Sequence, residues 1–233
     1  MAIIQSGASA TTLTTVDPTF NAIRNSEHPP EILGAYSMSS ISGALTLVAA
    51  GTPSAPQPLY AFRYAPATAT QLCMIRRIEV GFNTTTVFTA AQSLQYNILL
   101  ARAFSASYTV NATTQLFTQS NTGKMRTVMP QSGFVSGGLI QIATTAAMTT
   151  TASFTADTQF MSTVNGTTNA VGASLLVAPI FQHQPGDYPL IFAANEGFII
   201  NNGQVMGAGG VGNLIVNVEW MELAATTGNA IAY

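Results

Sequence analysis

The segment GFIINNGQVMGAGGVGNLIVNVEWMEL, residues 197–223, decides which class of fold the chain adopts. Gly207, Gly209 and Gly212 match the G-x-G-x-x-G pattern of a dinucleotide-binding turn, which needs a helix directly after its last glycine. After the glycines, apolar residues instead recur at every second position, at Leu214, Val216, Val218 and Trp220. A period of two is typical of a strand. The segment therefore predicts a strand on each side of a glycine-rich, hairpin-like connection, and it argues against a nucleotide site.

The rest of the chain shows the same kind of pattern in short segments that turn residues separate. Runs rich in β-branched and aromatic residues predict a pair of strands within 36–50 and further strands within 59–66, 72–88, 93–110, 139–160, 173–182 and 190–200. Pro179 is expected to end the strand in which it lies. No segment carries a long helical period, and no internal repeat occurs. The sequence thus predicts an all-β fold, a jelly-roll-like β-sandwich or barrel with an extended N-terminal arm.

The chain is expected to have three parts. Residues 1–35 predict the arm, because they sustain no period and the adjacent Pro29 and Pro30 favour extended backbone. Residues 36–225 predict a single β-sandwich domain, and residues 226–233 a C-terminal tail. Two hypotheses about the arm stay open: it lies along a partner subunit, or it is a disordered tail or a strap on its own domain.

The composition is poor in charge. Only 7% of the residues are charged, against roughly 25% in typical soluble domains. The formal net charge of −2 gives no electrostatic support for nucleic-acid binding. No stretch offers the ~20 consecutive apolar residues of a membrane-spanning helix, and the first residues lack the pattern of a signal peptide. Because isolated proteins usually rely on surface charge for solubility, the composition predicts that neighbouring subunits cover much of this surface.

Most of the basic residues lie in two places. Arg76 and Arg77 are adjacent in a predicted strand, so we expect them to point to opposite faces, one in a buried ion pair and the other exposed. In this register Arg76 shares a face with Ile78. Lys124 and Arg126 lie in a turn-rich loop, which either contacts an acidic partner surface or is solvated.

The cysteine and histidine residues do not form a pattern that indicates chemistry. Cys73 is surrounded by apolar residues and is expected to be a buried small hydrophobic residue. His28 stands alone, and His183 is separated from Asp187 by a proline turn. One histidine and one carboxylate are too few for a metal site, so the second pair predicts a hydrogen-bonded turn.

The acidic residues are scattered along the chain, at Asp17, Glu27, Glu31, Glu79, Asp157, Asp187, Glu196, Glu219 and Glu222. A glycosidase needs two facing carboxylates, whereas Glu219 and Glu222 fall on opposite faces of one predicted strand. No nucleophile-elbow, phosphate-loop or zinc-protease motif occurs. The sequence therefore predicts no catalytic, cofactor-binding or metal-binding residues, and a protein that is not an enzyme.

A series of motifs runs in order through most of the chain: VDPTFNAIRNSEHPPEILGAYSMSSISGALT (16–46), LYAFRY (59–64), IRRIEVGF (75–82), LLARAFSASYT (99–109), KMRTVMP (124–130), IATTAAMT (142–149), ANEGFIINN (194–202) and VNVEWMEL (216–223). Together they resemble a family of tailed-bacteriophage virion structural proteins. The chain departs from that pattern in residues 148–160, where the family would have a turn containing glycine and arginine.

The resemblance implies a component of the virion that is made in the cytoplasm of the host bacterium. With the low charge and the arm, it favours a capsid decoration, or cement, protein on the capsid exterior. Such a protein binds the lattice of the major capsid protein, commonly as a homotrimer, and has no direct contact with nucleic acid or membrane.

Two alternatives stay open. One is a tail, collar or fibre-base protein of the same virion. The other is a β-protein that binds or hydrolyses glycans of the host surface, which would need exposed aromatic residues beside a carboxylate. Trp220 is the only tryptophan, and its alternation places it in the core.

Overall fold

The computed structural model describes residues 32–104, 107–115, 124–125, 132–136, 138–149, 154–168, 174–184 and 187–224. The chain divides into two units, Met1–Pro30 and Glu31–Tyr233, and the described residues belong to the second. The predicted C-terminal tail, His28, Arg126 and the predicted arm up to residue 31 lie outside the described residues. The first strand occupies the remainder of the segment that was predicted as an arm.

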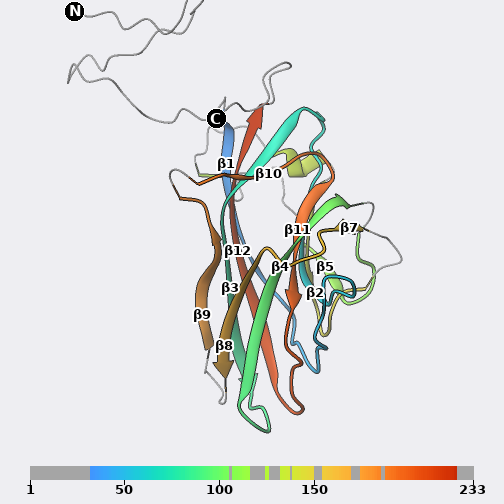
Figure 1. The fold of residues 1–233 in the computed structure, drawn as a ribbon, viewed down its shortest axis with the longest axis vertical. Coiled ribbons are helices and arrows are strands. Elements are labelled where there is room, and N and C mark those ends of the chain that lie inside the picture. The colour runs from blue at the N-terminus through green and yellow to red at the C-terminus, as the bar shows by residue number, and fades with distance from the viewer. Residues whose placement is uncertain are drawn as a thin grey trace, which may run out of the picture. The chain divides into compact units, whose positions relative to one another are not determined.

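The described residues form twelve strands in two antiparallel sheets (Figure 1). The first sheet contains β1 (Ile32–Ile41), β12 (Val211–Ala224) and β3 (Gln71–Thr86), followed by β10 (Leu190–Phe192) and β9 (Ser174–Gln182), which pair with different stretches of β3. The second contains β5 (Ala112–Thr114), β6 (Leu139–Ala143), β2 (Pro58–Tyr64), β11 (Glu196–Asn202) and β4 (Gln92–Phe104), and β4 also pairs with β7 (Phe154–Ala156) and β8 (Ser162–Thr168). A short 3-10 helix, η1, spans Gly133–Ser136.

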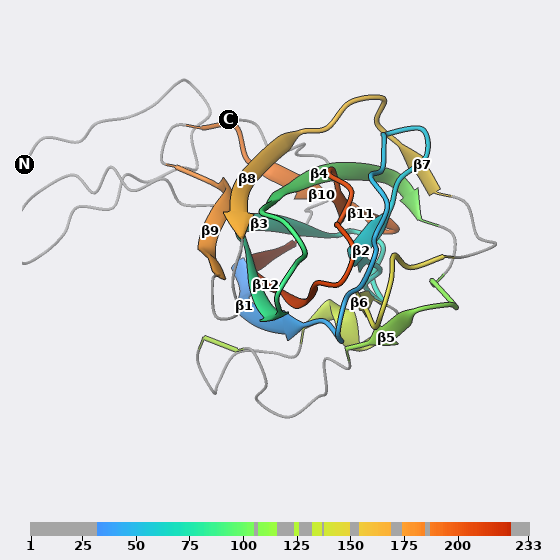
Figure 2. The same cartoon turned by 90° about the horizontal axis from the view of Figure 1, so that it is seen from below.

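The first half of the chain pairs with the second half in reverse order. Strand β1 pairs with β12, β2 with β11, β3 with β9 and β10, and β4 with β7 and β8. The first four of these strands alternate between the sheets, so consecutive strands face one another across the core (Figure 2). The predicted all-β fold is confirmed, and its two antiparallel sheets form a β-sandwich.

The core is built from aromatic residues of both sheets. Trp220 on β12, Phe62 on β2 and Phe198 on β11 are fully buried. The ring of Phe62 lies 5.6 Å from that of Trp220 and 5.1 Å from that of Phe198, measured between centroids. Edge-to-face and stacked rings at these distances stabilise the fold beyond the area that they bury. The alternation that placed Trp220 in the core is thereby confirmed.

The glycine-rich segment lies between two strands, as predicted. Strand β11 precedes it and β12 follows it, and Gly209 has a φ of 79°, a backbone conformation that glycine adopts readily. The expectation of a hairpin-like connection is wrong, because β11 belongs to the second sheet and β12 to the first. A period of two identifies a strand but not its partner, and here the partners are distant in sequence.

A β-bulge in β3 changes the predicted faces of that strand. Arg77 pairs with Glu219 of β12 and Ile75 with Trp220, so Arg76 is the extra residue. Ile75 and Ile78 are both fully buried in the core, whereas Arg76 is exposed between them. The predictions that the two arginines point to opposite faces, and that Arg76 shares a face with Ile78, are therefore wrong. One inserted residue reverses the alternation.

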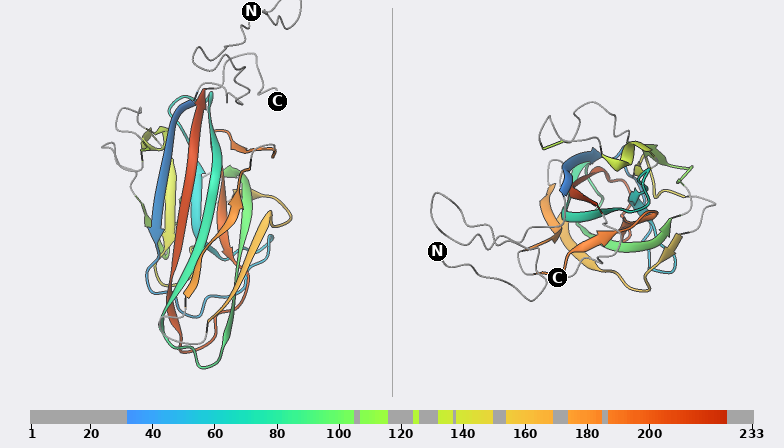
Figure 3. Two further views of the ribbon diagram at one scale, coloured as in Figure 1. Left: turned by 90° about the vertical axis from the view of Figure 1, so that its left-hand side faces the viewer. Right: turned by 90° about the horizontal axis from the view of Figure 1, so that it is seen from above.

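Two further boundaries differ from expectation. Strand β9 continues through Pro179, which pairs with Glu79 of β3 next to an irregularity in the register. Proline is tolerated at such irregularities and at sheet edges, where its missing N–H costs little. The region 36–50 contains one strand instead of a pair: β1 ends at Ile41, and the following residues make only an isolated bridge at Leu45. Strands β1, β12 and β3 lie side by side in Figure 3.

Candidate functional site

Charged residues are unevenly distributed along the sandwich. Strands β3 and β12 are antiparallel, and Glu79 of β3 pairs with Asn217 of β12. On one side of this pair, residues 80–86 of β3 and 211–216 of β12 contain no charged residue. The charged residues of both strands lie at Glu79 or on the other side of the pair. In the second sheet, Arg63 and Glu196 also lie where β2 ends and β11 begins. We call this end, where β1 begins and β12 ends, the charged end.

The opposite end, at the bottom of Figure 1, is formed by the loops at 87–91 and 203–210 and by the part of the loop at 42–57 that bonds to them. The loop at 42–57 then continues beside β7, where Pro53 and Ser54 lie near Phe154 and Asp157. These loops contain no Asp, Glu, Lys, Arg or His, and we call them the uncharged end. Backbone hydrogen bonds join them: the N–H of Met206 donates to the carbonyl of Val48 at 2.9 Å. The N–H of Thr89 donates to the carbonyl of Ala208 at 3.3 Å.

Neutral amide side chains hold the uncharged end together. The buried Asn202 donates through Nδ2 to the carbonyl oxygens of Val48, Ala49 and Gln204, at 3.3, 2.8 and 2.7 Å. Its neighbour Asn201 makes a second set of bonds: Oδ1 accepts from the N–H of Gln57 at 2.6 Å, and Nδ2 donates to the carbonyl of Gly51 at 3.2 Å. An amide satisfies buried backbone groups without the desolvation cost of a charge.

Large apolar side chains are exposed at this end. Leu47 is 67% exposed, Val205 55% and Val87 48%, and Ile41, the last residue of β1, is 62% exposed. Leu47 also has a φ of 48°, in the left-handed region that non-glycine residues rarely adopt. The structure therefore holds an apolar side chain in a conformation that costs roughly 1 kcal/mol, at a position where it contacts solvent.

A buried carboxylate, which the sequence analysis did not single out, lies at the charged end. Glu222 on β12 is 1% exposed, and its pKa is raised because burial disfavours the charged form. Ser132 donates its hydroxyl to Oε1, the N–H of Gly133 donates to Oε2 at 2.7 Å, and Trp220 Nε1 donates to Oε1 at 3.3 Å. The carboxylate thus ties the start of η1 to β12, and both of its oxygens are occupied by the fold.

The burial of Glu222 could have been predicted from the sequence. Glu222 lies two residues after Trp220 and therefore on the same, buried face of the strand. Glu219 lies on the other face, with its side chain 39% exposed, so the expected separation of these two carboxylates is confirmed. Cys73, the cross-strand neighbour of Glu222, is buried as predicted. Burial, and to a smaller extent Glu222, raises the pKa of this thiol well above its ordinary value. A thiol in that environment is a poor nucleophile.

The arginine pair of β3 lies outside the core. Arg77 makes an ion pair with Glu79, and Glu219 lies 4.0 Å away. The prediction of one paired and one exposed arginine is confirmed, but the pair is not buried: the side chain of Arg77 is 41% exposed. Lys124 forms an isolated bridge to Tyr36 of β1, so its backbone lies along the edge of the first sheet.

The predicted turn at His183 is present. The N–H of Gln184 donates to Asp187 Oδ2 at 3.1 Å, and the N–H of Asp187 donates to the carbonyl of Gln184 at 3.0 Å. Within the described ranges, no three His, Cys, Asp or Glu residues come close enough to hold a metal ion.

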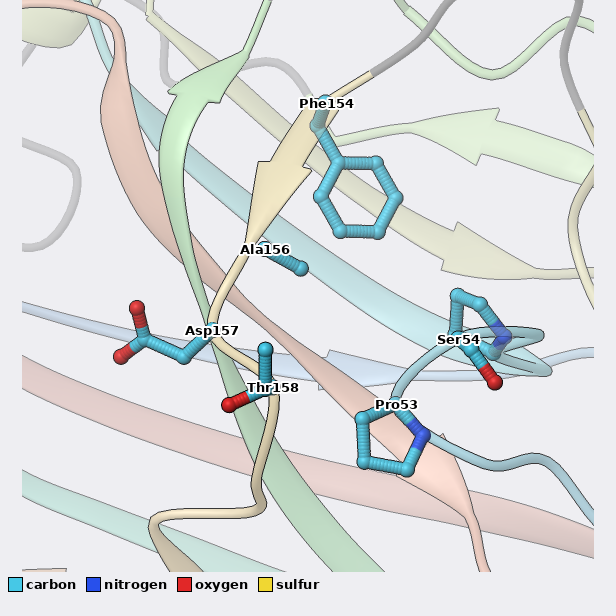
Figure 4. A pocket seen from close by; sticks show the side chains of 7 residues that line it. Pro53, Ser54, Phe154, Ala156, Asp157 and Thr158 are labelled. Carbon is cyan, nitrogen blue, oxygen red and sulfur yellow. The ribbon is translucent and has the colours of Figure 1, made fainter.

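A shallow hollow of about 440 Å³ lies between the loop at Pro53 and Ser54 and the segment from Phe154 to Thr158 (Figure 4). The carboxylate of Asp157 is directed away from Pro53 and Ser54. It accepts two hydrogen bonds from Arg102, at 2.9 and 2.7 Å, and these lower the pKa of Asp157. The acidic group beside the hollow therefore takes part in a surface ion pair.

The part of the chain that the structure describes contains no helix long and apolar enough to cross a membrane. Comparison with known proteins finds no family model that matches the chain, and no curated protein or solved structure that matches it.

Proposed function

We propose that this chain is a non-enzymatic structural protein of a tailed-bacteriophage virion, most specifically a capsid decoration protein. In this role it binds the lattice of the major capsid protein from the outside, as a homo-oligomer and preferentially a trimer, after synthesis in the host cytoplasm. It contacts neither nucleic acid nor membrane.

The observation that carries this proposal is the uncharged end, with four large apolar side chains exposed and no charge in its loops. Interfaces are depleted of charged residues at their centres, whereas free surfaces are not. A protein with such an end is better suited to be covered by other subunits than to remain solitary.

We further propose that the sandwich is jelly-roll-like, as the sequence predicts, and the strand order supports this. Pairing of the first half of the chain with the second half in reverse, across two sheets, is the arrangement of a long antiparallel ribbon folded over itself. Jelly rolls of this kind occur in viral capsid and lectin domains. Because a fold does not determine function, this support is secondary to that of the surface.

The test is to mix the full-length protein with undecorated phage heads and measure its occupancy, with its copy number in purified particles measured by quantitative mass spectrometry. We expect saturable binding and a copy number comparable to that of the major capsid protein. A copy number far below that, with no binding to heads, would instead indicate the tail, collar or fibre-base alternative. Absence from the particle would overturn the proposal.

Deleting residues 1–30 tests the arm separately. A body and an arm that both engage the lattice multiply their affinities, so the deletion should lower occupancy strongly. Unchanged occupancy would show that the arm does not contribute to attachment.

The glycan-binding alternative depends on exposed aromatic residues. Trp220 is fully buried and does not serve it, but Tyr188 is 85% exposed next to Asp187. Binding on a glycan array that a Tyr188→Ala substitution abolishes would favour this alternative over a decoration protein.

A further inference from the structure

We propose that the uncharged end is a homotypic interface, at which the same ends of neighbouring copies of this chain meet around a symmetry axis. The inference rests on the homo-oligomeric part of the proposed function and adds the surface that carries the contact. It does not require the capsid lattice, so it can be tested on the purified protein.

The apolar side chains of the end are presented by a fixed frame. The hydrogen bond from Met206 to Val48 places Val205 and Leu47 on adjoining loop segments. Asn202 fixes both of these loops, because its amide donates to Val48 and Ala49 on one side and to Gln204 on the other. Ordered loops lose little conformational entropy on association, so this surface is pre-organised for binding.

Leu47 is the sharpest indication of a partner. Its positive φ and its exposure are both unfavourable in an isolated subunit. Glycine would relieve the backbone strain, and any polar residue would relieve the apolar exposure. A leucine at this position has a favourable free energy relative to those residues only if another surface covers its side chain.

The absence of charge favours a second copy as the occupant. Where copies meet around a symmetry axis, residues next to the axis face their own equivalents, so charges there would face charges of the same sign and oppose the contact. The loops 42–57, 87–91 and 203–210 carry none. A different partner can be selected by charge complementarity, which the charged end offers and this end does not.

The size of the surface is sufficient for a stable contact. The three loops together contain 29 residues, of which seven are buried, and the remaining 22 fall within the roughly 20–30 that one side of a standard interface uses. Three loops from separate parts of the chain converge to form this surface.

The experiment measures self-association of the full-length protein by sedimentation velocity over a wide concentration range. The variants are Leu47→Asp and the matched control Tyr188→Asp, which adds the same charge at an exposed apolar position outside the uncharged end. We expect Leu47→Asp to weaken association at least about a hundredfold and the control to leave it unchanged. Equal behaviour of the two variants, or a monomeric wild-type protein throughout, overturns the inference.

Leu47→Gly keeps the test valid if an aspartate variant fails to fold. Glycine accepts the positive φ, so the thermal stability of the subunit should stay roughly unchanged. Removing a leucine side chain that is buried in the interface should still weaken association by about tenfold or more. Unchanged association of this folded variant contradicts the inference.

The outcomes separate this inference from the proposed function. A wild-type protein that is monomeric in solution yet decorates heads refutes the homotypic interface and leaves the decoration role intact. A protein whose self-association depends on Leu47, but that is absent from purified particles, supports the interface and refutes the decoration role.

Discussion

The two ends of the sandwich are held together by different kinds of side chain. At the charged end, the carboxylate of Glu222 accepts hydrogen bonds from the start of η1, and Arg77 and Arg102 make ion pairs on the surface. At the uncharged end, the amides of Asn201 and Asn202 organise the loops. A surface that other subunits cover must be desolvated, and a charge makes this costly, whereas a neutral amide that bonds to its own fold does not. The difference supports the proposal that other subunits cover the uncharged end.

The largest effect in this comparison is expected for Glu222→Ala. The substitution leaves the donors of Ser132, Gly133 and Trp220 unpaired in a buried site and creates a cavity, so the free energy of unfolding should fall by about 4 kcal/mol. Urea denaturation followed by tryptophan fluorescence measures this loss. Glu222→Gln keeps the shape and one acceptor oxygen and should lose clearly less; equal losses would show that the hydrogen bonds are unimportant.

The counterpart at the uncharged end is Asn202→Ala. Three carbonyl oxygens lose their donor, and the free energy of unfolding should fall by about 2 kcal/mol. The same denaturation experiment measures it, with Asn83→Ala, at an exposed position of β3, as the matched control. A loss no greater than that of the control would mean that the loops of this end do not depend on the amide.

Glu222, at the charged end, should make the stability of the protein depend on pH. The pKa of Glu222 is raised in the fold, so the folded state holds its proton more tightly than the unfolded chain. This contribution is fully present below the unfolded pKa of roughly 4.3, and it is lost as the pH rises through the higher folded pKa.

Relative to Glu222→Gln, the wild-type protein should therefore lose stability as the pH is raised from the acid side. Asp157, whose pKa Arg102 lowers, acts in the opposite direction, but it is common to both proteins and cancels. Denaturation midpoints measured over this pH range give the difference directly. A difference that does not vary with pH would show that Glu222 does not titrate differently in the fold.

The smallest effect is expected for Arg102→Ala. The ion pair with Asp157 is bidentate but exposed, so its removal should cost no more than about 0.5–1 kcal/mol. A double-mutant cycle with Asp157→Ala isolates the interaction. A coupling energy well above this range would mean that the charged end depends on its surface ion pairs, and the contrast between the two ends would need revision.

The sequence predicted the strands well because a period of two survives in most of them. It placed Trp220 and the residues before it in the core, and the same alternation extends to Glu222. The sequence-based prediction was wrong where a feature depends on which strand pairs with which. The bulge at Arg76 and the passage of residues 203–210 between sheets both follow from pairing with distant strands, which local periodicity does not record.

The uncharged end was only partly predictable. The low charge of the whole chain was evident, and it led to the expectation that subunits cover its surface. Residues 42–57 and 203–210 are visibly free of charge in the sequence, but their convergence depends on the order of strands in the two sheets. The exposure and positive φ of Leu47 could not be predicted, because they are set by contacts between these loops.

The most direct test of the central claim is the accessibility of the uncharged end in the assembled protein. The chain contains one cysteine, Cys73, which is buried, so Leu47→Cys and Tyr188→Cys each introduce one accessible thiol. Maleimide labelling rates are measured on both variants as the protein concentration is raised. We expect the thiol at position 47 to become protected while the thiol at position 188 stays reactive; equal labelling of the two positions at every concentration would contradict the account.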